Sequence, residues 1–269
     1  MAARYKRKHH VQQALFRHGG KRRGAGRKPA GDRAGTPHTT RDEISSSDVL
    51  HVVLRAVPGV GNLRCREVYK AVRAASVTTA RRTEFRIVHL SIQYNHIHML
   101  VEAESAEALA SGMHGFEISA ARHINTALRV GGRRRRGSVF AGRYYVVVIR
   151  SPKQVRHVLA YVLGNWRRHR EDRVGLPRRW LVDPFSTAVS FDGWKELEGQ
   201  PPWTIRPDYA PLVVTPAQSW LLCIGWRRHG AISVHEVPGP PTWPTTRPRA
   251  AGQPTSVVAR QHGRPSVEV

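Results

Sequence analysis

The chain has 269 residues, and its 44 Lys and Arg against 19 Asp and Glu give a formal net charge of +25. Such a surface attracts polyanions, so nucleic acid is the expected partner and an enzyme for small neutral substrates is disfavoured. The two cysteines, Cys65 and Cys223, fit neither a disulfide framework nor a zinc finger, which favours a reducing cytoplasm. No apolar run approaches the roughly 18 residues of a membrane span, so no membrane partner is expected.

The positive charge is concentrated in the N-terminal and middle parts of the chain. The net charge is +8 over residues 1–48, +15 over residues 49–195 and +2 over residues 196–269. Residues 1–48 are poor in large apolar side chains, so we predict a disordered basic arm. Its segment around Arg27 and Lys28 resembles an AT-hook, which lies in a narrow minor groove. A generic basic tail that adds salt-sensitive DNA affinity is the simpler interpretation.

The tail is rich in Pro, Thr and Gly. We predict an irregular C-terminal extension over residues 196–269, largely disordered at its end. A short ordered piece is expected at residues 219–226, where large apolar side chains gather.

The middle region, residues 49–195, is predicted to form one domain that alternates between strands and helices. Strands are predicted at residues 49–57, 85–92, 96–102 and 139–149, and helices at 63–80, 105–129 and 151–170. The Gly- and Arg-rich segment 131–137 is predicted to be a loop. The first six elements follow the order of a ferredoxin-like split βαβ fold of the α+β class. We therefore expect an antiparallel sheet with helices on one face, followed by a C-terminal helix.

The first chemical motif is His96-Ile97-His98 on the predicted third strand. Side chains alternate along a strand, so the two imidazoles point to the same face and Ile97 to the other. Two imidazoles placed in this way can hold one divalent metal, although two ligands alone are an incomplete site. Two ordinary histidines among the 15 of the chain remain the alternative.

The second motif lies on the last predicted helix. Tyr161 and Asn165 are four residues apart, so they share one face beside the apolar stripe of that helix. A packing tyrosine and an ordinary helix-end asparagine are the alternative interpretation. Together with the strand histidines, they supply three neutral ligands and one hydroxyl nucleophile, a coherent set for phosphoryl transfer.

Three segments in this order resemble the single-tyrosine HUH transposases, in which HUH stands for His, hydrophobic residue, His. They are Asn95-His-Ile-His-Met-Leu-Val101, Phe140-Ala-Gly-Arg-Tyr144 and Tyr161-Val-Leu-Gly-Asn165. The resemblance is strongest to the REP-associated tyrosine transposases and the IS200-like transposases, and it covers about residues 49–195.

This resemblance implies a transposase that acts on hairpin-bearing single-stranded DNA. Tyr161 would be the nucleophile that forms a 5′-phosphotyrosine link, and His96, His98 and Asn165 would bind Mg²⁺ or Mn²⁺. It also implies a bacterial protein in the cytoplasm, associated with the nucleoid, acting as a monomer or a homodimer. A catalytically inactive or domesticated DNA-binding protein, and a nuclease in which water attacks, remain open alternatives.

Further residues are candidates for contact with DNA. The run Arg133, Arg134, Arg135 and Arg136 suits a phosphate backbone, although it also fits a solvated flexible loop. Arg143 and Tyr144 could contact a phosphate and stack on a base, or pack in the core. Arg167 and Arg168 could touch DNA or simply suit the C-terminal end of a helix. Tyr69, Tyr94 and Tyr145 are rival nucleophiles, but Tyr94 lies too close to the histidines and the other two lack an amide one helical turn later.

Overall fold

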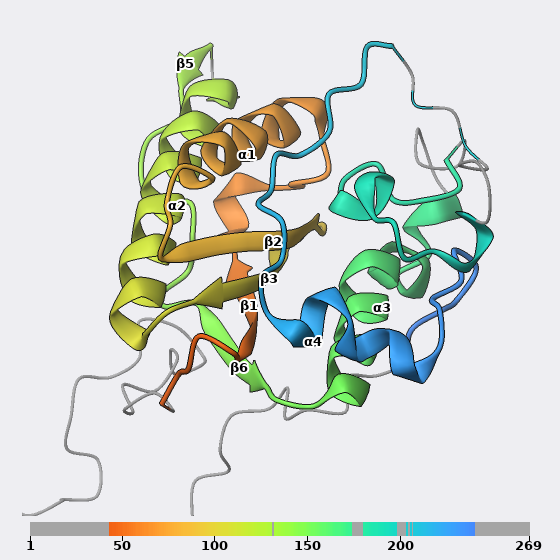
Figure 1. The fold of residues 1–269 in the computed structure, drawn as a ribbon. Helices are drawn as coiled ribbons and strands as arrows, with labels where there is room; N and C mark the ends of the chain where they lie inside the picture. Colours follow the sequence, from red (N-terminus) through yellow and green to blue (C-terminus); the bar gives the residue numbers. More distant parts are fainter. Residues whose placement is uncertain are drawn as a thin grey trace, which may run out of the picture. The chain divides into compact units, whose positions relative to one another are not determined.

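A four-stranded antiparallel sheet forms the centre of the domain (Figure 1). The computed structural model describes residues 43–130, 132–173, 180–197, 203, 205 and 207–239, so Arg27, Lys28 and most of the predicted basic arm lie outside it. The strand order is β2-β3-β1-β6, with β1 at Val49–Arg55, β2 at Phe85–Ile92, β3 at His96–Ala103 and β6 at Tyr145–Ile149. This arrangement confirms the predicted α+β class and antiparallel sheet.

Helices cover both faces of the sheet. Helices α1 (Arg66–Thr79) and α2 (Ala106–Ala127) pack on one face, against an apolar core that includes Leu50, Ile97 and Met99. The opposite face packs against α3 (Pro152–Arg168), through residues such as Leu100 and Leu159. The predicted cap of α3 is present, because the Ser151 hydroxyl accepts a hydrogen bond from the backbone N–H of Gln154.

The last strand is shorter than predicted. β6 begins at Tyr145, not near Val139, because Gly142 adopts φ +69°, a left-handed conformation that interrupts an extended chain. Phe140 keeps a single antiparallel bridge to Ala56. The segment predicted as a strand thus begins as an irregular link that crosses the end of β1.

The segment predicted as a loop at 131–137 contains a small hairpin. β4 (Arg129–Val130) pairs with β5 (Arg133–Arg134), and Gly132 supplies the positive φ of +76° that the tight turn needs. Helix α2 accordingly ends at Ala127, two residues before its predicted end. Arginine side chains are therefore displayed from a paired backbone.

Several segments of the C-terminal part of the chain cover the face of the sheet that carries α3. Val182, Ala188, Trp226 and Ile232 are buried there, and the short helix α4 (Trp220–Cys223) lies within the piece predicted to be ordered. Packing does not stop at the predicted boundary near residue 195, because Trp194 forms a bridge with Ile232. In the described part of the chain, no helix has the length and apolarity to cross a membrane.

Candidate active site

His96 and His98 lie on the face of β3 that is turned toward α3. Ile97, between them, is fully buried in the core under α1 and α2, so the expected alternation is confirmed. His98 is buried and His96 is half-buried. Their Nε2 atoms are 2.9 Å apart, so the two imidazoles converge on one point.

This convergence fits a shared cation. Adjacent ligands of an octahedral ion with bonds near 2.1 Å are themselves separated by about 3 Å, close to the observed distance. The Oδ1 of Asn95 lies 2.8 Å from Nδ1 of His96. Because a carbonyl oxygen only accepts, Nδ1 of His96 carries the proton and its Nε2 presents a lone pair. Asn95 thus orients His96 as a ligand.

A third histidine, His51 on β1, completes the cluster and was missed by the sequence reasoning. Its Nε2 lies 3.0 Å from Nδ1 of His98, and the two rings are stacked with centroids 5.1 Å apart. His98 pairs with Val53 in the register of β1 and β3, so His51 is its diagonal neighbour on the same face. An imidazole within the apolar run Val49–Leu54 was the sequence signal that could have revealed it.

Tyr161 on α3 packs directly against these histidines. Its ring lies edge-on to His98, with centroids 5.3 Å apart, and to His51, with centroids 6.1 Å apart. The side chain is half-buried, and burial raises the pKa of the phenol while the charge of Arg168 opposes that shift. Tyr161 therefore keeps its proton at neutral pH, and the strand and helix motifs of the sequence meet at one place.

Asn165 is fully buried on the same helix. Neither its amide nitrogen nor its carbonyl oxygen has a hydrogen-bond partner. It lies one turn after Tyr161 and one turn before His169, whose charge acts on both His96 and His98. Residues four apart share a helix face, so Asn165 lies on the same face of α3 as Tyr161. A buried amide without partners destabilises the fold by about 1–3 kcal/mol, which calls for a ligand at this position.

The electrostatic environment keeps the three imidazoles neutral. Burial lowers the pKa of His51 to about 3 and the pKa of His96 to about 4, and it lowers the pKa of His98 well below its usual value. Neighbouring positive groups, such as Arg55 beside His96, act in the same direction. Neutral imidazole is the form that binds metals.

The candidate donors at this site are two imidazoles and one buried amide. Within the residues that the structure describes, no group of three or more His, Cys, Asp or Glu side chains is arranged to hold a metal ion. A third protein ligand beside His96 and His98 would accordingly be the carbonyl oxygen of Asn165. Such a mixed N and O set suits a divalent first-row ion or Mg²⁺.

Comparison with known proteins identifies the domain that carries this site. The family described as "Transposase IS200 like" matches residues 49–165, the segment from β1 to Asn165. These residues form a domain of the IS200-like transposase family. One similar solved structure is described as "Structure of the REP associates tyrosine transposase bound to a REP hairpin". Its sequence identity is 18%, with a TM-score of 0.44, and the match covers 58% of this chain and 84% of that one. The comparison with curated proteins gave no match.

The candidate DNA-binding residues of the transposase domain differ in their exposure to solvent. Arg133, Arg134 and Arg136 are exposed, as is Arg143. Tyr144 is buried in the core under α1 and α2, which agrees with the packing alternative for this residue. Its stacking on a base stays a prediction without support from its position.

Two further arginines are held by the C-terminal part of the chain. Arg167 donates hydrogen bonds to the carbonyls of Val234 and Leu181, and Arg168 donates to that of Pro238. These bonds fasten the tail to the end of α3. A contact of Arg167 or Arg168 with DNA stays a prediction.

Two of the rival tyrosines, Tyr69 and Tyr94, have surroundings that differ from those of Tyr161. Tyr69 is buried on the opposite side of the sheet, where its hydroxyl is hydrogen-bonded to Tyr209 and to the carbonyl of Ala210. Tyr94 is 59% exposed at the turn before β3. The ring of Tyr161, by comparison, contacts both His51 and His98.

Proposed function

We propose that this transposase cleaves and rejoins single-stranded DNA through a covalent link to Tyr161. The observation that carries the proposal is the packing of the Tyr161 ring against His98, with the unpartnered amide of Asn165 one helical turn away. A hydroxyl nucleophile beside three neutral ligands is a set that phosphoryl transfer uses. The net charge of +25 supports DNA as the substrate.

The chemical step conserves the number of phosphate ester bonds. The Oη of Tyr161 attacks a backbone phosphorus and loses its proton, a new O–P bond forms, and the bond to the 3′ oxygen of the preceding nucleotide breaks. That oxygen takes up a proton, which leaves a free 3′-hydroxyl and a 5′-phosphotyrosine. Attack by a 3′-hydroxyl on this link reverses the step and joins strands, so no external source of energy is needed.

His96, His98 and Asn165 are proposed to hold one divalent cation, Mg²⁺ or Mn²⁺. When bound, such an ion withdraws electron density from the phosphate and stabilises the charge of the transition state. The residues of the chain provide the position: Asn95 and His51 orient the imidazoles, and α3 places the nucleophile and the amide on one face.

The proposed substrate is DNA that carries hairpins, as the resemblance to REP-associated transposases implies. A single strand is required at the site because Tyr161 is half-buried among side chains, where a flexible unpaired strand reaches more easily than a rigid duplex. We place this activity at the nucleoid, in the cytoplasm of a bacterium.

The test uses purified full-length protein, Mn²⁺ or Mg²⁺, and labelled single-stranded DNA from the flanks of the gene. A covalent protein–DNA band on a denaturing gel is expected for the wild type. Tyr161→Phe and His96→Ala should each reduce it by at least about 1,000-fold, because each removes a group that acts directly in the reaction.

Tyr94→Phe is the matched control, since this exposed tyrosine lies next to the histidines but away from the ring contact. It should keep the band. Cleavage without an adduct would support attack by water, and salt-sensitive binding without either product would support a DNA-binding protein that has lost catalysis.

A further inference from the structure

Gln93, which directly follows β2, is a buried polar side chain beside the histidine pair. Its backbone N–H donates a hydrogen bond of 2.8 Å to the carbonyl of His96, so the pairing of β2 with β3 continues one residue past the end of β2. Ser91, two residues earlier, pairs with His98 in the same register. Paired residues of an antiparallel sheet place their side chains on the same face. Gln93 and Ser91 therefore share the face of the sheet that carries His96 and His98.

The side-chain amide of Gln93 is bonded at one atom only. Gln93 is 1% exposed, and its Nε2 donates a hydrogen bond of 2.7 Å to Oγ of Ser91. This bond holds the amide beside the strand position that pairs with His98. The carbonyl oxygen, Oε1, is buried and has no hydrogen-bond partner. A buried acceptor of this kind calls for a ligand that donates a hydrogen bond or carries a positive charge.

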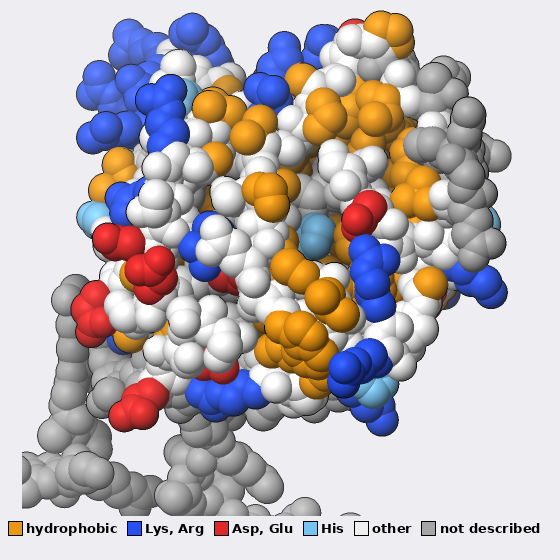
Figure 2. Space-filling model, viewed as in Figure 1, with side chains coloured by type: hydrophobic (Ala, Val, Ile, Leu, Met, Phe, Trp, Pro, Cys, Tyr) orange, Lys and Arg blue, Asp and Glu red, His pale blue; other side chains and the backbone are white. Residues whose placement is uncertain are grey.

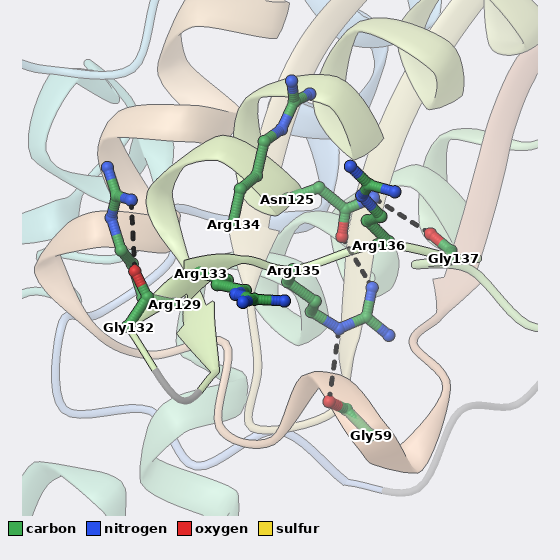
Figure 3. Close-up of a pocket in the computed structure, with 9 residues that line it drawn as sticks. All are labelled: Gly59, Asn125, Arg129, Gly132, Arg133, Arg134, Arg135, Arg136 and Gly137. Atoms are coloured by element: carbon green, nitrogen blue, oxygen red, sulfur yellow. Dashed lines mark hydrogen bonds between the residues drawn. The ribbon is translucent and has the colours of Figure 1, made fainter.

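Another carboxamide of the domain shows how such a group is satisfied within the protein. Asn125 lines an open hollow beside β5 (Figure 3). Its Oδ1 accepts a hydrogen bond of 2.6 Å from Arg135, and its Nδ2 donates one of 2.9 Å to the carbonyl of Gly137. Among the described residues, the carboxamides that keep a buried atom without a partner are those of Gln93 and Asn165. One adjoins the histidine pair through the sheet, and the other belongs to the helix that packs on that pair.

The charge of the chain opposes a cation at the histidine pair. The net charge is +25, and Figure 2 shows Lys and Arg side chains gathered over the region where Figure 1 places β5. Closer to the site, Arg55 pairs with His96 across β1 and β3, and its positive charge acts on that imidazole. Neutral imidazoles and amides carry no negative charge that would offset this repulsion. Each additional oxygen donor therefore matters for retaining Mg²⁺ or Mn²⁺.

We propose that Gln93 is a fourth ligand of the divalent cation, through Oε1 of its side chain. This inference rests on the proposed function, because it adds a ligand to the site of His96, His98 and Asn165. The set would then comprise two imidazole nitrogens and two amide oxygens, supplied by β3, by α3 and by the residue that follows β2. Oxygen donors suit Mg²⁺ and Mn²⁺. Because such ions take more than four ligands, positions remain for oxygens of the DNA phosphate and for water.

The experiment measures the affinity of the full-length protein for Mn²⁺ in the absence of DNA, by calorimetry and by the paramagnetic resonance of free Mn²⁺. Gln93→Met keeps an unbranched side chain of similar length and removes the oxygen. Its Mn²⁺ affinity should fall at least about 10-fold, as expected for the loss of a group that binds or orients a metal. Gln93→Glu keeps an oxygen at the same position and adds a negative charge, so it should bind Mn²⁺ at least as tightly as the wild type.

Asn125→Met is the matched control, because it removes a carboxamide that lies away from the histidine pair and has both atoms bonded. Its Mn²⁺ affinity should stay close to that of the wild type. An unchanged affinity in Gln93→Met, or an equal fall in the control, would overturn the proposal. Thermal unfolding without metal shows whether each variant is folded. If Gln93→Met does not fold, Gln93→Glu decides, and a Mn²⁺ affinity below that of the wild type would overturn the proposal.

Formation of the covalent DNA adduct separates this inference from the proposed function. Raising the Mn²⁺ concentration should restore the adduct in Gln93→Met, because His96, His98 and Asn165 are unchanged and binding follows mass action. Absence of the adduct in the wild type would contradict the strand-transfer chemistry, while the Mn²⁺ affinities would still decide whether Gln93 binds the ion. A weaker DNA affinity in Gln93→Met with an unchanged Mn²⁺ affinity would show that Gln93 contacts the substrate instead, which would overturn its role as a ligand.

Discussion

The two faces of one sheet carry opposite kinds of side chain. The face under α1 and α2 is apolar throughout, with Leu50, Val52 and Leu54 from β1 facing Ile97, Met99 and Val101 from β3. The face under α3 holds the buried polar groups His51, His98 and Glu102 among its apolar contacts. Side chains alternate between the two faces along a strand. Neighbouring residues of one strand therefore belong either to the apolar face or to the face that carries the polar groups.

The polar groups on the second face differ in how fully they are bonded. The carboxylate of Glu102 accepts hydrogen bonds from Arg86 and from the backbone N–H groups of Gln218 and Ser219. Asn165 has no partner for either amide atom. A buried polar group with all its partners contributes to the fold, whereas one without partners points to a ligand.

The largest expected effect on stability is at Glu102. Glu102→Ala leaves the buried guanidinium of Arg86 without its carboxylate and two backbone N–H groups of the C-terminal segment without an acceptor. We expect the free energy of unfolding in urea to fall by about 3–5 kcal/mol, as for other broken buried ion pairs.

The double variant Glu102→Leu with Arg86→Met is the control for this prediction. Removing both charges leaves no unpaired ion, so much of the lost stability should return. A loss below about 1 kcal/mol in Glu102→Ala would mean that Glu102 does not fasten the tail to β3.

A smaller effect is expected at His51, and it concerns the metal. A cation bound to Nε2 of His98 requires that Nδ1 of His98 carry the proton. That N–H group then donates a hydrogen bond to Nε2 of His51. His51→Phe removes this acceptor. We expect Mn²⁺ affinity, measured by calorimetry or by the paramagnetic resonance of free Mn²⁺, to fall about 10- to 100-fold.

His89→Phe is the matched control for His51, because it also removes a histidine of the sheet, one that interacts with Thr187 and Phe191 away from the histidine pair. Its Mn²⁺ affinity should stay near that of the wild type. Equal affinities in His51→Phe and the wild type would show that His51 packs against His98 without orienting it.

The apolar periodicity of the sequence was sufficient to predict most of the fold. One face of α2 is marked by apolar residues at helical spacing, namely Leu109, Met113, Phe116 and Ile124. All four are buried, as that spacing predicts. The errors lie where single glycines decide the backbone, at Gly132 and Gly142, since periodicity carries no information on φ. Within residues 207–239, order was predicted only for residues 219–226, because the apolar side chains on either side of that piece are widely spaced and follow no regular period.

The candidate site was predictable to the extent that its residues lie on two short motifs. Alternation on β3 and the four-residue spacing on α3 bring His96, His98, Tyr161 and Asn165 to one region. His51 was missed because it comes from a strand 45 residues earlier in the chain, and its meeting with His96 and His98 depends on strand pairing. The contact of Arg135 could not be predicted either, because four consecutive arginines look alike until the structure shows which one bonds to the side chain of Asn125.

The smallest effect on stability is expected at Asn165, where the substitution should raise the stability and not lower it. Asn165→Leu replaces an unpartnered buried amide with an apolar side chain of similar size, so the metal-free protein should be more stable by up to about 1 kcal/mol. For a chain of this size, that corresponds to a rise in Tm of about 2–4 °C. Mn²⁺ should raise the Tm of the wild type and leave that of Asn165→Leu almost unchanged, since binding stabilises only a fold that holds the ion. A variant less stable than the wild type without metal would instead show that the amide has partners within the protein. If Asn165 serves to bind a ligand and not to pack, Asn165→Leu should gain stability and lose metal binding at the same time.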